Sequence, residues 1–262
     1  MWAERHMPTL VLHWTLSCIA VVVMAARLVG RKMFGQSYVA GDYLTMAAIL
    51  CVVARVALVH VVLLWGTSNM SPKFREEHTF TFQEVYMRTI GSQLNFVCSL
   101  DYGTFLWIQK LVLFDLLHRL IRDLPYYDIV IRVYVSVFAA SYVAIQAITF
   151  TECRPIELNW QVFPDPGECV KAQGQLLTLG IFNVATDLML LILPIPIFAM
   201  LRVSWQRKAQ LYTLFTLGIL VVLVTVVRLP INVEHRHSHA NLTSWTAQAA
   251  ILQRESGAYG WS

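Results

Sequence analysis

The sequence has 262 residues, of which 57% are hydrophobic and only 14% are charged, and its mean hydropathy is +0.56. A soluble domain carries about 25% charged residues, so this composition excludes an ordinary soluble protein. The net charge of +4 is modest and no basic patch is interleaved with aromatic residues, which excludes a nucleic-acid-binding protein.

The apolar residues are gathered into runs that are long enough to cross a membrane. Runs of about eighteen or more mostly apolar residues are typical of transmembrane helices. The sequence holds six of them, in chain order at residues 9–29, 43–66, 96–121, 129–150, 176–203 and 211–229. We therefore expect an all-α, polytopic membrane protein in which residues 1–230 form a six-span domain in the lipid bilayer and residues 231–262 form an extramembrane tail.

The first run and the basic residues predict the orientation of the chain. Basic residues follow the first run rather than precede it, so we expect no cleavable signal peptide and an N-terminus on the outer side. Lys and Arg concentrated in short loops mark the cytoplasmic side of a membrane protein. The short connections after the first, third and fifth runs hold Arg27, Arg31, Lys32, Arg119, Arg122, Arg202, Arg207 and Lys208. The expected location is the plasma membrane or an endomembrane.

Two further features fall on the side that this topology places outside. Asn241 lies in the sequon Asn-Leu-Thr and is a candidate for N-glycosylation. Cys153 and Cys169 bracket a loop rich in Pro and Gly, and two cysteines in one short loop of an oxidising compartment predict a disulfide. Cys98, at the outer end of the third run, is the rival partner.

A helical pattern also occurs between the second and third runs. Thr81 and Glu84 fit a capping box, and apolar residues follow at helical spacing, namely Phe82, Val85, Tyr86 and Ile90. The pattern predicts a short amphipathic helix on the outer surface, and a lid over a ligand is the alternative.

Ionisable side chains inside the spans are costly, and they mark either a functional site or a buried ion pair. They are Arg55, His60, Asp101, Lys110, Asp115 and Asp187, accompanied by the neutral polar residues Asn183 and Gln146. The set fits two interpretations, a polar ligand pocket and an ion-pair network that holds the helices together.

Asp187 is the carboxylate that most needs a partner, because it lies in the middle of an apolar run. At a rise of about 1.5 Å per residue, Arg55 and Asp187 both lie roughly 15 Å from the outer edge and Lys110 roughly 20 Å, whereas His60 and Asp101 lie roughly 6–8 Å from it. We therefore expect Arg55 to neutralise Asp187, with Lys110 as the second candidate. Asn183 is on the same helical face as Asp187 and joins the network.

Motifs for common enzyme chemistry are missing from the sequence. No His, Cys and Glu cluster has the spacing of a metal site, and no Gly-rich phosphate loop or nucleophile elbow is present. We expect neither a metal nor another cofactor, and hydrolase or kinase activity has no support.

An ordered series of motifs resembles one family. The motifs are DYL at residues 42–44, WIQKLVLFDLLHRL at 107–120, the loop CRPIELNW…PDPGEC at 153–169, NVATDLMLLILPIPIF at 183–198 and RKAQLYTLFTLGILVVLVTVVRLP at 207–230. Together they resemble the fungal rhodopsin-like domain from about residue 27 to residue 230. That family includes appressorial receptor-type proteins and the membrane protein of satratoxin-type toxin clusters.

The resemblance implies a seven-helix bundle with an extracellular N-terminus, an outer-loop disulfide and a cytoplasmic tail. It implies the fold without the photochemistry, because no lysine lies in a last helix, where a retinal Schiff base would form; the lysines are Lys32, Lys73, Lys110, Lys171 and Lys208. After Pro230 the chain is too short and too polar for a seventh span, so we expect six spans or a truncated seventh-helix region. Coupling to a G protein then has little support.

Two classes of function fit these observations. The first is a receptor-like protein that binds a hydrophobic small molecule, or an accessory protein in fungal secondary-metabolite biosynthesis. The alternative is an intramembrane enzyme in which Asp101 and Asp187 protonate a polyketide or terpene intermediate. A transporter has less support, because no inverted repeat is evident.

Overall fold

The computed structural model describes residues 2–70, 75, 78–118, 126–167 and 173–193. These residues form five α-helices and one short 3-10 helix, and no strand occurs among them. The helices are α1 (Trp2–Met33), α2 (Ala40–Trp65), α4 (Phe82–His118), α5 (Tyr127–Thr151), the 3-10 helix η1 (Ile156–Asn159) and α6 (Gln173–Ile192). The expected all-helical fold class is confirmed.

Four stretches of helix in the described part are long and apolar enough to cross a membrane, at Leu10–Met33, Ala40–Trp65, Tyr127–Thr151 and Gly174–Ile192. Helices suit that environment because each satisfies its own backbone hydrogen bonds where no water is present. The expected spans 9–29, 43–66 and 129–150 each overlap one of these stretches, and the span 176–203 begins in α6. The expected span 96–121 lies in α4 up to His118, and α4 is not among the four. The remainder of that span, the span 211–229 and the tail from 231 onward lie outside the described residues.

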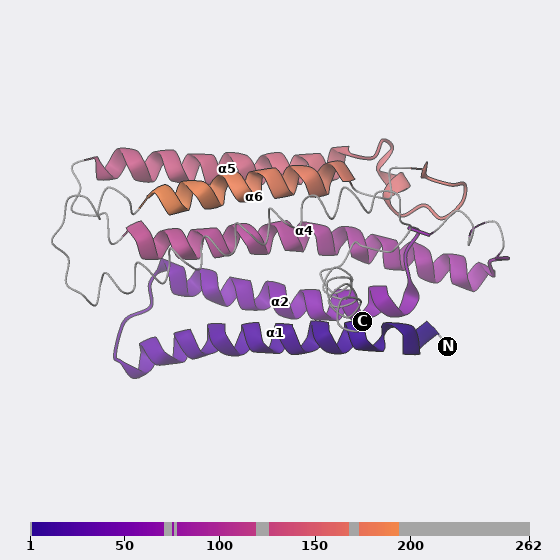
Figure 1. The fold of residues 1–262 in the computed structure, drawn as a ribbon, viewed down its shortest axis with the longest axis horizontal. Helices are drawn as coiled ribbons and strands as arrows, with labels where there is room; N and C mark the ends of the chain where they lie inside the picture. Colours follow the sequence, from indigo (N-terminus) through magenta and orange to yellow (C-terminus); the bar gives the residue numbers. More distant parts are fainter. Residues whose placement is uncertain (1, 71–74, 76–77, 119–125, 168–172, 194–262) are drawn as a thin grey trace, which may run out of the picture.

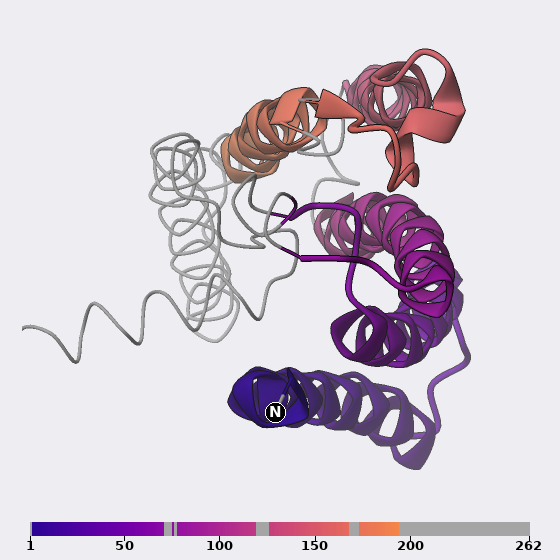
Figure 2. The ribbon, with the colours of Figure 1, turned by 90° about the vertical axis from the view of Figure 1, so that its right-hand side faces the viewer.

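The helices run side by side, with α4 between α2 on one side and α5 and α6 on the other (Figure 1). Viewed end-on, they form an open arc with α1 at one end and α6 at the other (Figure 2). Accordingly, α1 packs on α2, α2 packs on α4, and α4 packs on α5 and α6. The end at which α1 begins also holds the segments 66–70, 78–81 and 152–167 (Figure 1), and we call it the loop-rich end.

Helix α4 differs from the expectation at its beginning. The pattern at residues 81–90 is not a separate surface helix, because α4 runs without a break from Phe82 to His118. Its start is the expected one: the backbone N–H of Thr81 donates to the Glu84 carboxylate over 2.9 Å. This hydrogen bond is the main reason that the pKa of Glu84 is lowered. At 37 residues, α4 is about 55 Å long, so it exceeds the roughly 30 Å hydrocarbon layer of a bilayer.

A close contact between two glycines sets the register of α2 and α4. A methyl group on Gly91 would overlap the carbonyl oxygen of Gly66, which ends α2 with a φ of 75°. Next to this crossing, the Ser92 hydroxyl accepts the backbone N–H of Ser68 over 2.8 Å and donates to the Ser68 hydroxyl over 3.0 Å. The sequence pair Gly91-Ser92 is therefore a packing site in a continuous helix and not a helix end.

The apolar core lies between α4, α5 and α6. Its buried members are Trp107, Phe114, Leu117, Phe138, Ile145, Leu179, Leu190 and Leu193. Phe114 stacks on Tyr134 at 5.7 Å between ring centroids and meets the edge of Phe138 at 5.8 Å. The indole N–H of Trp107 donates to the Phe138 carbonyl over 3.0 Å, so the one polar atom of this large side chain is satisfied.

The loops at the loop-rich end are held together by cations and aromatic rings. Arg75 donates to the carbonyl oxygens of Ser68 and Val162, and its guanidinium lies 5.7 Å from the Phe163 ring centroid. Phe80 packs edge-on against Phe163 at 5.4 Å. These contacts join the segment after α2 to the segment after α5 across the end of the bundle.

Candidate functional site

Two charged residues in the middle of α4, Asp101 and Lys110, form ion pairs on different faces of this helix. Asp101 meets Arg55 of α2, and Lys110 meets Asp187 of α6. Nine residues of helix correspond to about two and a half turns, so the two side chains leave α4 in opposite directions and about 13 Å apart along it. The structure therefore contains two separate ion-pair sites, and Asp101, which the depth estimate groups with His60, pairs with Arg55 instead.

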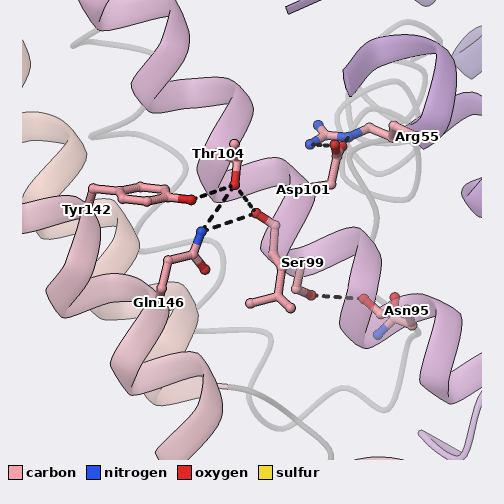
Figure 3. Close-up of polar contacts among 8 residues, drawn as sticks. Arg55, Asn95, Ser99, Asp101, Thr104, Tyr142 and Gln146 are labelled. Atoms are coloured by element: carbon pink, nitrogen blue, oxygen red, sulfur yellow. Dashed lines mark hydrogen bonds and ion pairs between the residues drawn. The ribbon is translucent and has the colours of Figure 1, made fainter. Parts of the chain in front are cut away.

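The first pair lies between α2 and α4. Arg55 donates through Nε and Nη2 to the same oxygen of Asp101, Oδ2, over 3.3 and 3.2 Å (Figure 3). The guanidinium also lies over two rings of α4, at 4.7 Å from the centroid of Tyr102 and 5.5 Å from that of Phe105. Both charged side chains are largely removed from solvent, with exposed fractions of 12% and 14%.

The second pair is enclosed by further polar contacts. Lys110 donates to Asp187 and to the backbone carbonyl of Asn183, the latter over 3.2 Å, and its ammonium lies 5.9 Å from the Trp107 ring centroid. The side-chain amide of Asn183 donates to the other oxygen of Asp187 over 3.1 Å. Each oxygen of the carboxylate thus has its own donor, which is the arrangement that a buried ion pair needs to be stable.

The expected pairing of Arg55 with Asp187 is wrong, and the second candidate, Lys110, is the partner that the structure gives. For Arg55, the reason is the starting point of the depth scale. The expected span of α4 begins at Phe96, whereas Gly66 at the end of α2 contacts α4 at Gly91. Counted from that crossing, Arg55 and Asp101 both lie about 15 Å along their helices.

A third polar contact joins α4 to α5. The hydroxyl of Thr104 lies 3.1 Å from the hydroxyl of Tyr142 and accepts the side-chain N–H of Gln146 over 3.2 Å (Figure 3). Figure 3 places these residues on the side of α4 away from Arg55. The other atom of this amide, Gln146 Oε1, is buried and has no hydrogen-bond partner in the described part of the chain.

Two histidines lie away from the α4–α5 contact, where α1 packs on α2. His60 packs edge-on against Trp14 of α1, with 5.9 Å between the ring centroids. His13, beside Trp14, is only 7% exposed. Sequence reasoning included His60 and missed His13, because this histidine lies in a run that is otherwise apolar. A polar side chain one helical turn inside a span was the signal that could have found it.

Asp115 lies toward the other end of α4 and belongs to neither pair. Its carboxylate lies 3.7 Å from His118 and packs against the backbone of Gly41 at the start of α2. Nearby, Asp42 is fully buried and pairs with Arg31 at 3.3 Å. These contacts tie the α1–α2 connection to α4.

The remaining predicted residues are at, or beyond, the limits of the described chain. Cys153 is buried, with 1% of its surface exposed, while Cys98 is a free thiol and so is not its partner. Cys169 and Asn241 lie outside the described residues, so the Cys153–Cys169 bridge and the glycan stay predictions. Within the described part, no group of three His, Cys, Asp or Glu residues is placed to hold a metal ion.

A capping carboxylate at the loop-rich end connects α5 to α6. Glu152 accepts the backbone N–H groups of Gly174 and Gln175 over 2.8 and 3.1 Å. A carboxylate at a helix N-terminus is stabilised by the unpaired N–H groups there. Burial nevertheless raises the pKa of Glu152, against the effect of these two hydrogen bonds.

Comparisons with known proteins assign the chain to a family but find no similar solved structure. The profile of the family described as fungal rhodopsin domain matches residues 26–253. A SAT4 family membrane protein of Emericella nidulans is 26% identical over 148 residues, which are 55% of this chain and 38% of that protein. The match thus spans well under half of the relative's length. No solved structure matches the chain.

Proposed function

Because the chain belongs to the fungal rhodopsin domain family, we propose that it is a receptor-like membrane protein that binds a hydrophobic small molecule through a polar group. The binding serves either sensing or an accessory step in secondary metabolism. The supporting observation is the Arg55–Asp101 pair, which lies between α2 and α4 with its guanidinium over two aromatic rings. Among the described residues, no hydrogen bond is made by Nη1 of this guanidinium. Ionisable groups inside a membrane protein are by default candidates for such a role.

The contrast between the two ion pairs supports this choice of site. Lys110 and Asp187 satisfy each other together with Asn183, as a pair that holds α4 to α6 would. Arg55 directs two of its donor nitrogens at one carboxylate oxygen, which leaves donor capacity for a ligand. The alternative of an intramembrane enzyme needs a free acid, and Asp101 and Asp187 are each held by a cation.

We further propose that the loop-rich end faces the outside of the cell or the lumen of an endomembrane. The basic residues Arg31, Lys32 and His118 end α1 and α4 at the opposite end of the bundle. Positive charge at that end is the pattern of a cytoplasmic side. In this orientation the bridge between Cys153 and Cys169 forms in an oxidising compartment.

A thermal-shift screen of the purified protein against hydrophobic fungal metabolites tests the function. We expect saturable stabilisation by at least one compound, and a loss of that stabilisation in Arg55→Gln. Arg132→Gln is the matched control, because Arg132 is an exposed cation of α5 whose Nε donates to the Asp128 carbonyl one turn earlier in the same helix. Ligand binding that is unchanged in Arg55→Gln would refute the proposed site. If no compound gives saturable stabilisation, the proposed function is refuted.

A further inference from the structure

The Arg55–Asp101 pair leaves one nitrogen of the guanidinium without a hydrogen bond. Nε and Nη2 of Arg55 both donate to Oδ2 of Asp101, over 3.3 and 3.2 Å (Figure 3). Nη1 makes no hydrogen bond among the described residues, and it is not one of their side-chain atoms that are both closed to solvent and unpaired. The two N–H groups of Nη1 are therefore open to a ligand.

The carboxylate of Asp101 has less to offer a ligand than the guanidinium has. Oδ2 accepts both hydrogen bonds from Arg55, and the thiol of Cys51, which is a weak donor, lies beside the carboxylate. The charge of Asp101 is already matched by that of Arg55. What the site lacks is thus an acceptor for Nη1, and not a donor or a charge.

The pair as a whole is neutral, and this limits the charge of the ligand. A carboxylate or phosphate on Nη1 would bring an unmatched negative charge to a site whose two charged side chains are only 12% and 14% exposed. An unmatched charge is costly in such a low-dielectric setting. Lys110 does not offset it, because this lysine lies about 13 Å away along α4 and is paired with Asp187. A neutral acceptor adds a hydrogen bond without adding a charge.

The aromatic rings beside the guanidinium favour a flat ligand. The guanidinium lies 4.7 Å from the ring centroid of Tyr102 and 5.5 Å from that of Phe105. Because guanidinium N–H groups lie in the plane of the group, an acceptor approaches Nη1 at its edge, next to these rings. A conjugated ring system that carries the acceptor can then pack on the aromatic surface.

We propose that Arg55 binds the carbonyl oxygen of a neutral, planar conjugated ketone, whose rings pack against Tyr102 and Phe105. The inference rests on the proposed function, since it names the class of ligand that the Arg55–Asp101 site takes. A hydrogen bond from a charged donor is stronger than one between neutral groups, so the carbonyl contributes much of the affinity. The site should prefer the ketone both to the hydrocarbon of the same shape and to a carboxylate on the same ring system.

Two pairs of compounds that differ in one carbonyl group test this preference, namely fluorenone with fluorene and xanthone with xanthene. Binding to the full chain in phosphatidylcholine nanodiscs is measured against empty nanodiscs, so that partition into the lipid is subtracted. We expect each ketone to bind at least about tenfold more tightly than its hydrocarbon. Fluorene-9-carboxylate should bind more weakly than fluorenone.

The carbonyl stretching band of bound fluorenone gives a readout that a merely structural role of Arg55 would not change. A hydrogen bond to the oxygen weakens the C=O bond, so the band should move to lower wavenumber than in empty nanodiscs. In the double variant Arg55→Met with Asp101→Leu, the band should stay where it is in lipid and the ketone preference should be lost. This variant replaces the whole pair by apolar groups, which is often neutral or stabilising for a fold.

The other ion pair of α4 supplies the matched control. Lys110→Met with Asp187→Leu also replaces a buried pair by apolar groups, but on the side of α4 that faces α6. This variant should keep both the preference for the ketone and the shift of its carbonyl band.

Asp101→Asn gives an expectation of the opposite sign. Asparagine keeps an oxygen that can accept from Arg55, but the site then carries the net positive charge of the guanidinium. The preference should therefore reverse, so that fluorene-9-carboxylate binds more tightly than fluorenone.

Three results would overturn the inference. They are equal binding of ketones and hydrocarbons by the wild type, a ketone preference that persists in the double variant of Arg55 and Asp101, and no reversal in Asp101→Asn. The two proposals can fail separately. A metabolite that needs Arg55 but is an anion refutes the ketone class and leaves the receptor function. Ketone binding of the expected kind without any metabolite ligand does the opposite.

Discussion

At the scale of single residues, Lys110 and Asp187 are the groups whose stability depends most on each other. Their side chains are only 6% and 14% exposed, and the carboxylate has one donor on each oxygen. A buried charge that loses its partner is far more costly than a buried pair replaced as a whole by apolar groups. The pair therefore makes a definite prediction about single and double substitutions.

We expect Asp187→Leu to destabilise the protein by about 3–5 kcal/mol, because it leaves the Lys110 ammonium buried and unpaired. Adding Lys110→Met should recover much of this loss. The measurement is a double-mutant cycle on the free energy of unfolding in detergent. A parallel cycle of Asp187→Leu with Arg55→Met should be additive, and coupling in that cycle instead would contradict the pairing described above.

Glu84 gives a pH dependence whose sign follows from its hydrogen bonds. The pKa of this carboxyl is lowered in the folded protein, chiefly by the N–H of Thr81. Its stabilising effect is therefore present above the ordinary value of 4.5 and is lost as the pH falls through the lowered value. We expect amide exchange in the first turn of α4 to rise over that acidic range relative to Glu84→Gln. If the ratio of the exchange rates of the wild type and Glu84→Gln did not change with pH, this expectation would be wrong.

The sequence was sufficient to identify every ionisable residue of the two pairs, because such residues are rare in apolar runs. It was not sufficient to pair them. Pairing depends on where neighbouring helices cross. The Gly66–Gly91 contact shows that depth along α4 has to be counted from Gly91, about a turn and a half before Phe96, where the expected span begins. His13 was overlooked since a single histidine hardly changes the hydropathy of a span.

At the scale of helices, the α2–α4 crossing carries the most specific packing requirement. Gly91 admits the carbonyl of Gly66, and no larger residue fits there without moving one helix. Gly and Ser are poor helix formers in isolation. In the bundle the same small residues permit close approach of two backbones, which is their usual use between membrane helices.

Gly91→Ala should lower the stability by about 1–3 kcal/mol, since the new methyl group must displace a backbone carbonyl. Gly30→Ala is the matched control on α1, where a Cβ would meet nothing within 4 Å. That control should be neutral or stabilising by up to about 1 kcal/mol, as alanine is the better helix former. Melting temperatures of the two variants in one detergent check both expectations. Equal losses would mean that the crossing is looser than described.

At the scale of the whole molecule, the arc of helices and its two different ends determine how the protein sits in the membrane. Hydropathy alone predicted the all-helical architecture, because few other structures satisfy backbone groups in lipid. It could not predict the order of contacts among the described helices, in which α4 is central and α1 packs on α2. That order depends on side-chain fit along each helix, which the apolar composition does not encode.

The loop-rich end should contain a disulfide between Cys153 and Cys169. Because Cys98 is a free thiol, non-reducing peptide mapping should join the peptide of Cys153 to that of Cys169 while Cys98 is alkylated. Reduction should cost about 3 kcal/mol if loop entropy dominates. Alkylation of both Cys153 and Cys169 without prior reduction would refute the bridge.

The glycosylation sequon tests which face of the membrane this end occupies. If it faces the outside or a lumen, Asn241 should carry a glycan, and endoglycosidase treatment should increase the electrophoretic mobility of the wild type. The Asn241→Gln variant should already migrate at the deglycosylated position. A wild-type band that the enzyme does not shift would leave the orientation without this support.

The two ion pairs also affect the order in which the helices become stable in the membrane during synthesis. Arg55 leaves the ribosome 46 residues before Asp101, and Lys110 leaves it 77 residues before Asp187. At about 5–20 residues per second, the two cations wait about 2–9 s and 4–15 s for their carboxylates. During that delay each lone cation opposes insertion of its helix by about 2.5–3.5 kcal/mol at the bilayer centre. We therefore expect α2 to stay at the translocon until α4 is synthesised, and α4 to stay there until α6 is synthesised. Each helix then enters the lipid once its cation has paired with the carboxylate of the later helix.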